Sequence, residues 1–400
     1  MSTWTPEYPA LWPTTEDELL LRAALLGGTA CADDFTRWRR ETGLKNYDEI
    51  EYITCRVLPL VYKQLLRLEM DDPWLPKMKS LHRYHWVTTK AKQQRMVKLV
   101  GHFGRTGIDT IVLKGNALIA GGYFDDAGDR PLQDIDILIR PEDEEAALEQ
   151  LRSLKWEDVG PDQFVEYHSY NWRGADGVHL DLHRKLFQPP YPYVGFDSLW
   201  PHSKEVELFG VPVRIPDPTH LLMHCVVHGR VCWGTVANPF LWVVDAMRIL
   251  QKASEEIDWG RLENEAKQLQ ITFNIRETLG YLRSRFNAPV PDDWLRGLLE
   301  IELSRKEMVP FFRWTHQQKL HSLLEVKDFL DADYRCHQQM TRQEPSSSGY
   351  ARYACGRLHR LLTTDVGRHW IRNFGRKLRY EGWIASIRRP DYFNLPGDDV

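Results

Sequence analysis

Hydrophobic positions in the first quarter of the chain recur with the spacing of α-helices. A capping-box pair, Thr15 and Glu18, precedes an apolar run of leucine and alanine over residues 19–25. Further apolar residues return every three or four positions over 57–66. These patterns predict a helical block at the start of the chain.

Beyond this block the pattern becomes that of a mixed α and β region. The short, β-branched stretch 108–113 predicts a strand, and 116–124 predicts a helix. Apolar and polar residues alternate over 132–140, as they do in a strand with one buried face. Residues 141–154 open with proline and four acidic residues, which favour the first turn of a helix.

Two further strands are predicted over 164–172 and 178–183, followed by a hairpin over 205–215. Helical spacing returns from residue 217 onward. This order predicts an α+β fold, in which a small mixed sheet is flanked by helical blocks. The expected segments are an N-terminal helical block (1–106), an α/β core (107–215), a helical domain (216–342) and a basic, aromatic C-terminal helical segment (343–400).

Composition narrows the class of protein. With 42% hydrophobic and 27% charged residues, the 400-residue chain is typical of a folded protein and is not wholly disordered. A net charge of −4 excludes a uniformly basic nucleic-acid coat. Six cysteines without a C-x-x-C pair favour reduced thiols. We find no secretory leader and no apolar run of membrane length, so we expect a cytoplasmic protein without a membrane partner.

Three aspartates are the main candidates for chemistry. Asp134 and Asp136 are two residues apart on a predicted strand, so their side chains project from one face, and their backbones are about 6–7 Å apart. Like charges so placed repel, and a bridging Mg²⁺ or Mn²⁺ would relieve the repulsion. Replacing either one should likewise relieve strain in the ion-free protein. Asp181, between two leucines, would allow a second ion; the alternative is that all three are solvated surface acids.

A candidate phosphate-binding element lies upstream of these acids. The predicted strand runs into Lys114-Gly115-Asn116 and then a helix, which would direct backbone N–H groups and one cation at the same point. The spacing is not that of a Walker A loop. A simple turn is the alternative interpretation.

These motifs resemble a known family. The matching runs are L-K-G-N-A-L over 113–118, R-P-L-Q-D-I-D-I-L over 130–138 and L-D-L-H over 180–183. They are similar to the uncharacterised bacterial nucleotidyltransferases of the DNA polymerase β superfamily, strongly over 107–185 and more weakly to about 255. The resemblance implies a polymerase-β-type mixed sheet. Gly115-Asn116 stands where most of the superfamily has Gly-Ser or Gly-Gly.

The resemblance also implies a reaction. Asp134 and Asp136 would bind two Mg²⁺ or Mn²⁺ ions, and Asp181 would bind the catalytic ion and help to deprotonate an acceptor hydroxyl. A nucleoside monophosphate would pass from an NTP or dNTP to that hydroxyl, and pyrophosphate would leave. Two metal ions flanking the attacking and leaving oxygens suit such a displacement.

The same resemblance implies nucleotide-binding roles. Lys114, Gly115 and Asn116 would hold the triphosphate. Arg130 would brace the loop or bind a phosphate; alternatively it pairs with Asp126 or Asp129 in the turn before it. His183, on the face that carries Asp181, would contact the base, ribose or a phosphate, or would be a structural histidine.

Two other patterns leave alternatives open. His220, His224 and His228 form one helical stripe, which could bind metal, face the nucleotide cleft or simply pack. Between residues 352 and 389 arginines alternate with aromatic residues, and Arg372, Arg376 and Arg379 share a helical face. That combination suits single-stranded nucleic acid, although a solvated helix face is the simpler interpretation.

The acceptor is therefore open at the level of sequence. It could be a small molecule or peptide, a protein side chain, or the 3′-hydroxyl of a growing nucleotide or oligonucleotide. The last would fit bacterial antiviral defence signalling, and the basic C-terminal segment favours it. A non-catalytic nucleotide-binding scaffold is the rival from another class.

Overall fold

The computed structural model describes residues 12–44, 46–160, 168–187, 193–229, 241–303, 307, 350, 353, 355 and 356. The predicted nucleic-acid-binding residues Arg372, Arg376 and Arg379 lie outside these ranges. Within them, no helix has the length and apolar composition needed to cross a membrane.

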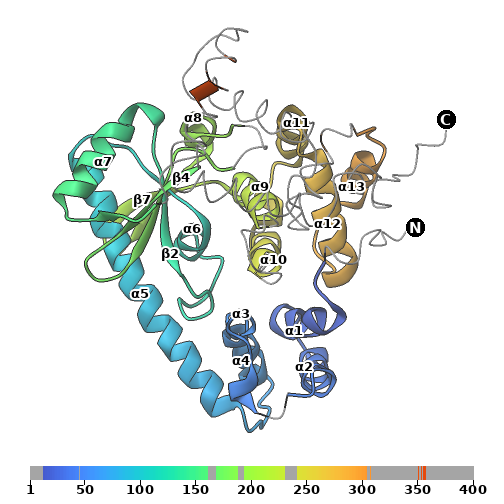
Figure 1. Ribbon diagram of the computed structural model, residues 1–400. Coiled ribbons are helices and arrows are strands. Elements are labelled where there is room, and N and C mark those ends of the chain that lie inside the picture. Colours follow the sequence, from blue (N-terminus) through green and yellow to red (C-terminus); the bar gives the residue numbers. More distant parts are fainter. Residues whose placement is uncertain are drawn as a thin grey trace, which may run out of the picture.

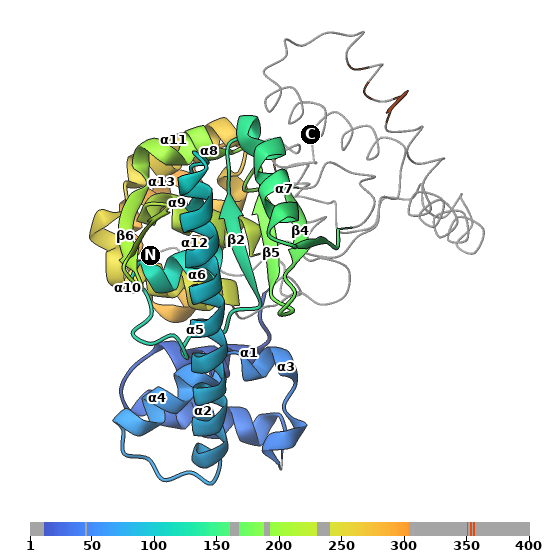
Figure 2. The ribbon, with the colours of Figure 1, turned by 90° about the vertical axis from the view of Figure 1, so that its left-hand side faces the viewer.

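The chain begins with the predicted helical block. Its helices are α1 (Thr15–Leu25), α2 (Thr29–Glu41), α3 (Tyr52–Cys55), α4 (Leu58–Arg67) and α5 (Leu75–Arg105), with a 3₁₀ turn over Tyr47–Glu49. The apolar run predicted over 19–25 is the buried face of α1. Helix α5 extends from this block to the sheet and packs along it (Figure 2).

The capping box of α1 lies one residue earlier than predicted. Thr14, in an extended conformation, accepts a hydrogen bond from the Asp17 backbone N–H (3.2 Å), and the Asp17 carboxylate accepts from the Thr14 N–H (3.0 Å). Glu18 is thereby free to accept a hydrogen bond from Tyr281 Oη (3.0 Å). The Thr15–Glu18 prediction was wrong because it assigned to the cap an acid that serves a long-range contact.

A five-stranded mixed sheet follows. The strands are β1 (Ile111–Val112), β2 (Asp134–Leu138), β3 (Glu157–Asp158), β4 (Ser169–Arg173) and β5 (His179–His183). Their order is β1-β2-β5-β4-β3; β2 and β5 are parallel, and the other pairs are antiparallel. Helices α6 (Lys114–Ala120) and α7 (Glu144–Ser153) follow β1 and β2 respectively. The predicted mixed sheet of an α+β fold is therefore confirmed.

Several strand and helix bounds differ from the predictions. The stretch 108–113 yields only two strand residues, because β1 pairs only with the end of β2, and α6 begins at Lys114 rather than at 116. β2 is shorter than 132–140 because the Leu132 carbonyl accepts a hydrogen bond from Lys92 Nζ (2.7 Å) before the strand starts. Part of the strand predicted over 164–172 lies outside the described residues.

The remaining elements complete a helical cover. The predicted hairpin is confirmed as β6 (Lys204–Leu208) and β7 (Val211–Ile215). The helices are α8 (Phe196–Leu199), α9 (Pro218–His228), α10 (Leu241–Ala253), α11 (Trp259–Leu269), α12 (Thr272–Phe286) and α13 (Asp292–Leu299), with 3₁₀ turns over Pro141–Asp143, Trp200–His202 and Ser254–Glu256. Helices α5 and α7 lie on one side of the sheet, and α9 and α10 lie on the other (Figure 1).

The two helical regions meet although they are far apart in sequence. Trp12 stacks on Tyr281 of α12, with ring centroids 4.5 Å apart. Arg22 of α1 donates a hydrogen bond to the carbonyl oxygen of Arg285 (3.3 Å). The buried apolar residues of both regions and of the sheet form one continuous core.

Candidate active site

The three predicted acids meet on one face of the parallel strand pair. Asp134 and Asp136 lie on β2, and Asp181 lies on β5 in register with Asp136. Because side chains alternate along a strand, this register places all three carboxylates on the same face. Asp136 is buried, whereas Asp134 and Asp181 are partly exposed.

Lys114 lies against these acids. Its Nζ is 2.6 Å from Asp136 Oδ1 and 3.8 Å from Asp181 Oδ2. It adopts a φ of 49° at the start of α6, a left-handed conformation that non-glycine residues rarely take and that is common at functional sites. Backbone strain is therefore found at Lys114, the residue whose amine pairs with Asp136.

His183 supports Asp136 from within the core. Its Nε2 is 3.0 Å from Asp136 Oδ1, and its side chain is fully buried against the His168 ring, 4.8 Å away between centroids. It is absent from the lining of the cavity described below. Its geometry matches the structural alternative: His183 orients Asp136.

The acids differ in their electrostatic environment. Burial, together with the Asp136 charge, raises the pKa of Asp134 and of Asp181 to about 6, although Lys114 opposes the shift at both. Burial also acts to raise the pKa of Asp136, but Lys114 and His183 outweigh it and hold that pKa well below its ordinary value. The close contact with Lys114 argues against the expectation that replacing Asp136 relieves strain, because its charge is already compensated. The raised pKa of Asp134 agrees with the expectation for that residue.

The residues present fit divalent ions. Ligand atoms of Asp136, Asp181 and His183 all lie within 4.8 Å of one another, and Asp134 is on the same face. Burial and the Asp136 charge keep the pKa of Asp134 and of Asp181 raised despite Lys114, so a bound cation would stabilise both charged carboxylates. Carboxylate oxygens are ligands that Mg²⁺ and Mn²⁺ prefer.

A cavity of about 330 Å³ opens beside the acids. This volume falls within the usual range for a small-molecule site. Its residues come from the α3–α4 junction, α6, β2 and the loop before it, α9 and α10: Arg56, Lys114, Gly115, Leu118, Arg130, Leu132, Gln133, Asp134, Asp136, Leu221, His224, Cys225, His228, Gly229, Leu241, Trp242 and Asp245. The charged groups stand beside the apolar surface of Trp242 and the leucines, as a nucleotide would require.

Gly115 and Asn116 contact the segments that position the acids. A Cβ at Gly115 would lie 2.6 Å from Leu132 Cδ2 and 3.4 Å from Arg130 Cζ, so a larger residue would make Leu132 shift in the loop before β2. Asn116 is fully buried, and its Nδ2 donates a hydrogen bond to the Asp134 carbonyl oxygen (3.2 Å). Asn116 therefore holds β2 in place and does not line the cavity.

Arg130 forms a bidentate ion pair with Asp245 of α10. Nε and Nη2 donate to the two carboxylate oxygens at 2.6 and 2.7 Å, and Nη1 donates to the Pro131 carbonyl oxygen at 2.8 Å. The alternative partners Asp126 and Asp129 were wrong choices, because the partner comes from a helix 115 residues further along the chain. Arg130 braces the loop, as one interpretation of the resemblance implied.

The histidine stripe divides between two environments. His224 and His228 line the cavity. Burial and the Lys114 charge lower the pKa of His224 to about 3 and that of His228 well below its usual value, so both rings are neutral near pH 7. His220 instead faces Asp217 (Nδ1–Oδ1 2.8 Å) and Glu265 (Nε2–Oε2 3.1 Å). The stripe thus combines the cleft-facing and the packing interpretations.

The His220 cluster should make stability depend on pH. Burial lowers the pKa of His220, but Asp217 and Glu265 outweigh it and the net pKa is raised. A raised folded-state pKa adds stability that is fully present below the unfolded value near 6.5 and is lost as pH rises through the folded value. We expect His220→Gln to cost roughly 1–2 kcal/mol more at pH 5.5 than at pH 9, measured by urea unfolding. An equal cost at both pH values would contradict an ionised His220.

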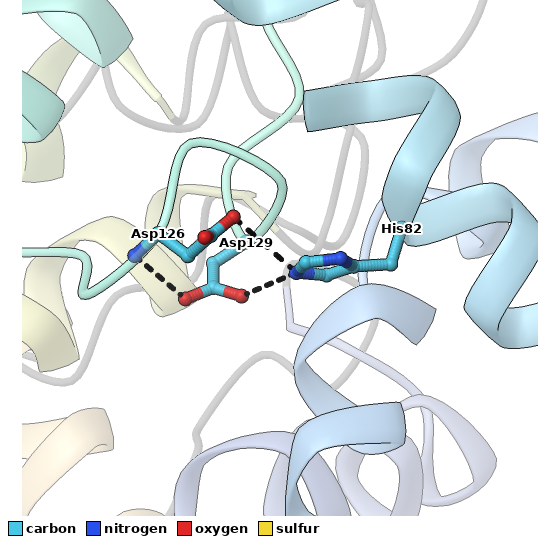
Figure 3. Close-up of side chains that lie close together, drawn as sticks. All are labelled: His82, Asp126 and Asp129. Atoms are coloured by element: carbon cyan, nitrogen blue, oxygen red, sulfur yellow. Dashed lines mark hydrogen bonds and ion pairs between the residues drawn. The ribbon is translucent and has the colours of Figure 1, made fainter. Parts of the chain in front are cut away.

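A second cluster, of His82, Asp126 and Asp129, has metal-ligand spacing, but its acids already have partners within the protein. His82 of α5 faces Asp126 and Asp129 in the loop between α6 and β2, with Nε2–Oδ1 distances of 3.5 and 3.2 Å (Figure 3). Asp129 also accepts hydrogen bonds from Lys63 Nζ (2.7 Å) and the Asp126 N–H (3.2 Å). These contacts tie the loop to α4 and α5.

Sequence reasoning missed two polar residues of the cavity, Arg56 and Gln133. Arg56 Nη1 donates to Gln133 Oε1 at 3.1 Å, across 77 residues of chain. Nothing in the local pattern of either residue distinguishes it from a solvated one. Trp242 of α10 also forms part of the cavity wall.

Comparison with known proteins finds a matching family model and similar solved structures. A family model described as uncharacterised nucleotidyltransferase matches residues 52–287. An antigenic nucleotidyltransferase-like protein from Paracoccidioides brasiliensis is structurally similar, with 15% identity and a TM-score of 0.32, over 51% of this chain and 95% of that one. No curated protein matches the chain significantly.

Proposed function

Because the chain belongs to the uncharacterised nucleotidyltransferase family, we propose that it transfers a nucleoside monophosphate from an NTP or dNTP to a hydroxyl acceptor and releases pyrophosphate. One observation carries the proposal: Asp134, Asp136 and Asp181 share a face of the sheet, and two of them line a cavity of nucleotide size. The neighbouring Lys114 supplies a cation for the phosphates.

In this mechanism Asp134 and Asp136 would hold two divalent ions, and Asp181 would hold one of them. When bound, Mg²⁺ or Mn²⁺ supplies positive charge at the α-phosphate and at the leaving oxygen. Asp181, which would bind the catalytic ion, would also help to deprotonate the acceptor hydroxyl. His183 keeps the Asp136 carboxylate oriented.

Lys114 changes partners during the reaction in this proposal. In the ion-free protein its amine neutralises Asp136. Lys114 also lines the cavity, so in the loaded site its amine would be placed to contact the triphosphate. Lys114 thus serves first as an internal counter-ion and then as a phosphate ligand.

For the acceptor we favour the 3′-hydroxyl of a nucleotide or oligonucleotide, in a bacterial defence or signalling role. The support is the arginine and aromatic composition of residues 352–389, which suits a single strand. A small molecule, peptide or protein acceptor is the competing proposal, and a non-catalytic scaffold is the rival outside enzymes. The size of the labelled product separates these acceptors.

The direct test incubates the full chain with each labelled NTP and dNTP, with Mg²⁺ or Mn²⁺. We expect pyrophosphate release that EDTA abolishes, and label in a product larger than the donor nucleotide. Asp134→Asn serves as the inactive control. Release of inorganic phosphate in place of pyrophosphate would point to a different reaction, and tight nucleotide binding without any turnover would favour the scaffold.

A further inference from the structure

Arg56 places a buried positive charge in the cavity wall. It caps the C-terminal end of α3, is 7% exposed and lines the cavity. Nη1 donates to Gln133 Oε1 (3.1 Å) and Nη2 to the Pro131 carbonyl oxygen (3.3 Å). Its Nε is buried and has no hydrogen-bond partner within the described part of the chain.

The other cations of the cavity wall have carboxylate partners, whereas Arg56 has none among the residues that the structure describes. Arg130 pairs with Asp245, and Lys114 pairs with Asp136. Among the described residues, no carboxylate lies within ion-pair distance of Arg56. Burial, with the Arg130 charge adding to it, lowers the pKa of Arg56 to about 10, so the guanidinium remains charged at neutral pH. Asp245 and Asp134 favour the charged form from beyond ion-pair distance, so an anion bound in the cavity would give this buried charge the direct partner that the described residues do not.

We propose that Arg56 binds the triphosphate of the donor nucleotide, and hence the pyrophosphate that leaves. A guanidinium donates several N–H groups in a planar fork that matches phosphate oxygens. Arg56 and Lys114 line the same cavity, and the Gln133 that Arg56 contacts is adjacent to the candidate metal ligand Asp134. This inference rests on the proposed function and names a phosphate-binding residue for it.

The position of Arg56 gives the N-terminal helices a part in substrate binding. Arg56 lies between α3 and α4, outside the sheet region that holds the acids. The family similarity begins at residue 52, so it includes this junction. The competing explanation is structural: Arg56 would only hold the loop 131–133 through its two existing hydrogen bonds.

The test measures binding of inorganic pyrophosphate to the full chain by calorimetry, with and without Mg²⁺. We expect Arg56→Gln to weaken binding about tenfold to hundredfold, as loss of one charge-assisted hydrogen-bonding group would. Arg56→Lys should recover part of the affinity because it keeps the charge. Circular dichroism establishes that each variant is folded at the temperature used.

Arg248→Gln is the matched control. Arg248 of α10 also has a buried Nε without a partner among the described residues, and burial lowers its pKa, but it does not line the cavity. Its replacement should leave the pyrophosphate affinity unchanged. Equal weakening by Arg56→Gln and Arg248→Gln would overturn the proposal, because it would indicate general destabilisation.

Three further outcomes would overturn the inference. In the first, the wild-type protein fails to bind pyrophosphate. In the second, Arg56→Gln binds pyrophosphate with normal affinity. In the third, Arg56→Gln weakens only the binding of a nucleoside monophosphate, which would assign the contact to an acceptor phosphate. The proposed function fails separately. Arg56-dependent pyrophosphate binding without release of pyrophosphate from any NTP or dNTP would leave the anion site standing alone.

Discussion

Asp136→Asn is expected to slow nucleotidyl transfer by about a thousandfold or more. Asp136 is the central acid of the site, in register with Asp181 and two residues from Asp134. Loss of this proposed metal-binding carboxylate would remove several kcal/mol of transition-state charge stabilisation, and about 4 kcal/mol corresponds to that factor. The measurement is the rate of pyrophosphate release at saturating nucleotide and Mg²⁺.

The asparagine variants of the three aspartates should differ in stability, although all three should lose activity. Without divalent ions, Asp136→Asn should cost about 3–5 kcal/mol of unfolding free energy, because it leaves Lys114 without its closest partner. Asp134→Asn and Asp181→Asn should be neutral or stabilising, since burial and Asp136 raise the pKa of both acids. Urea unfolding in EDTA measures these differences.

Glu157→Gln is a suitable control for this series. Glu157 lies on β3 of the same sheet, is exposed and pairs with Arg173. Its replacement should change neither activity nor stability by a measurable amount. Full activity in Asp134→Asn would exclude that residue as a metal ligand, and an unchanged stability of Asp136→Asn would show that its pair with Lys114 contributes nothing.

Asp245→Ala is expected to lower the free energy of unfolding by about 3–5 kcal/mol, because it leaves the buried Arg130 unpaired. It should also raise the KM for nucleotide. Arg130 packs beneath Gly115, so a shift of its guanidinium moves the backbone next to Lys114. Chemical denaturation and steady-state kinetics give the two readouts.

The double variant Arg130→Leu/Asp245→Leu separates charge from geometry. If the loss in Asp245→Ala comes from an uncompensated guanidinium, removing both charges should restore most of the stability. The KM should remain raised, because the bidentate contact that fixes the loop is gone. A double variant whose stability loss equals the sum of the two single losses would mean that the residues are not coupled.

The sequence was informative where chemistry follows strand periodicity. The two-residue spacing of Asp134 and Asp136 places them on one face of any strand, and the apolar neighbours of Asp181 mark it as buried or paired. The β2–β5 register that unites them could not be predicted. It depends on how the chain passes through α7 and two antiparallel strands before it returns.

Charged residues that act over long distances were not predictable. Arg56 contacts Gln133 and Arg130 contacts Asp245, across 77 and 115 residues respectively. A lone arginine in a local window indicates a solvated side chain, and only the assembled fold buries it. The two-residue strands β1 and β3 are missed or misplaced for a related reason, because two residues carry no periodic signal.

The contact between α1 and α12 has a consequence for synthesis of the protein. Tyr281 meets Glu18 across 263 residues, so the N-terminal helices emerge from a ribosome long before their partner helix. At about 5–20 residues per second, the interval is on the order of 10–50 s. During that time the apolar face of α1 lacks part of its final cover, which makes this segment a natural site for chaperone binding or early aggregation.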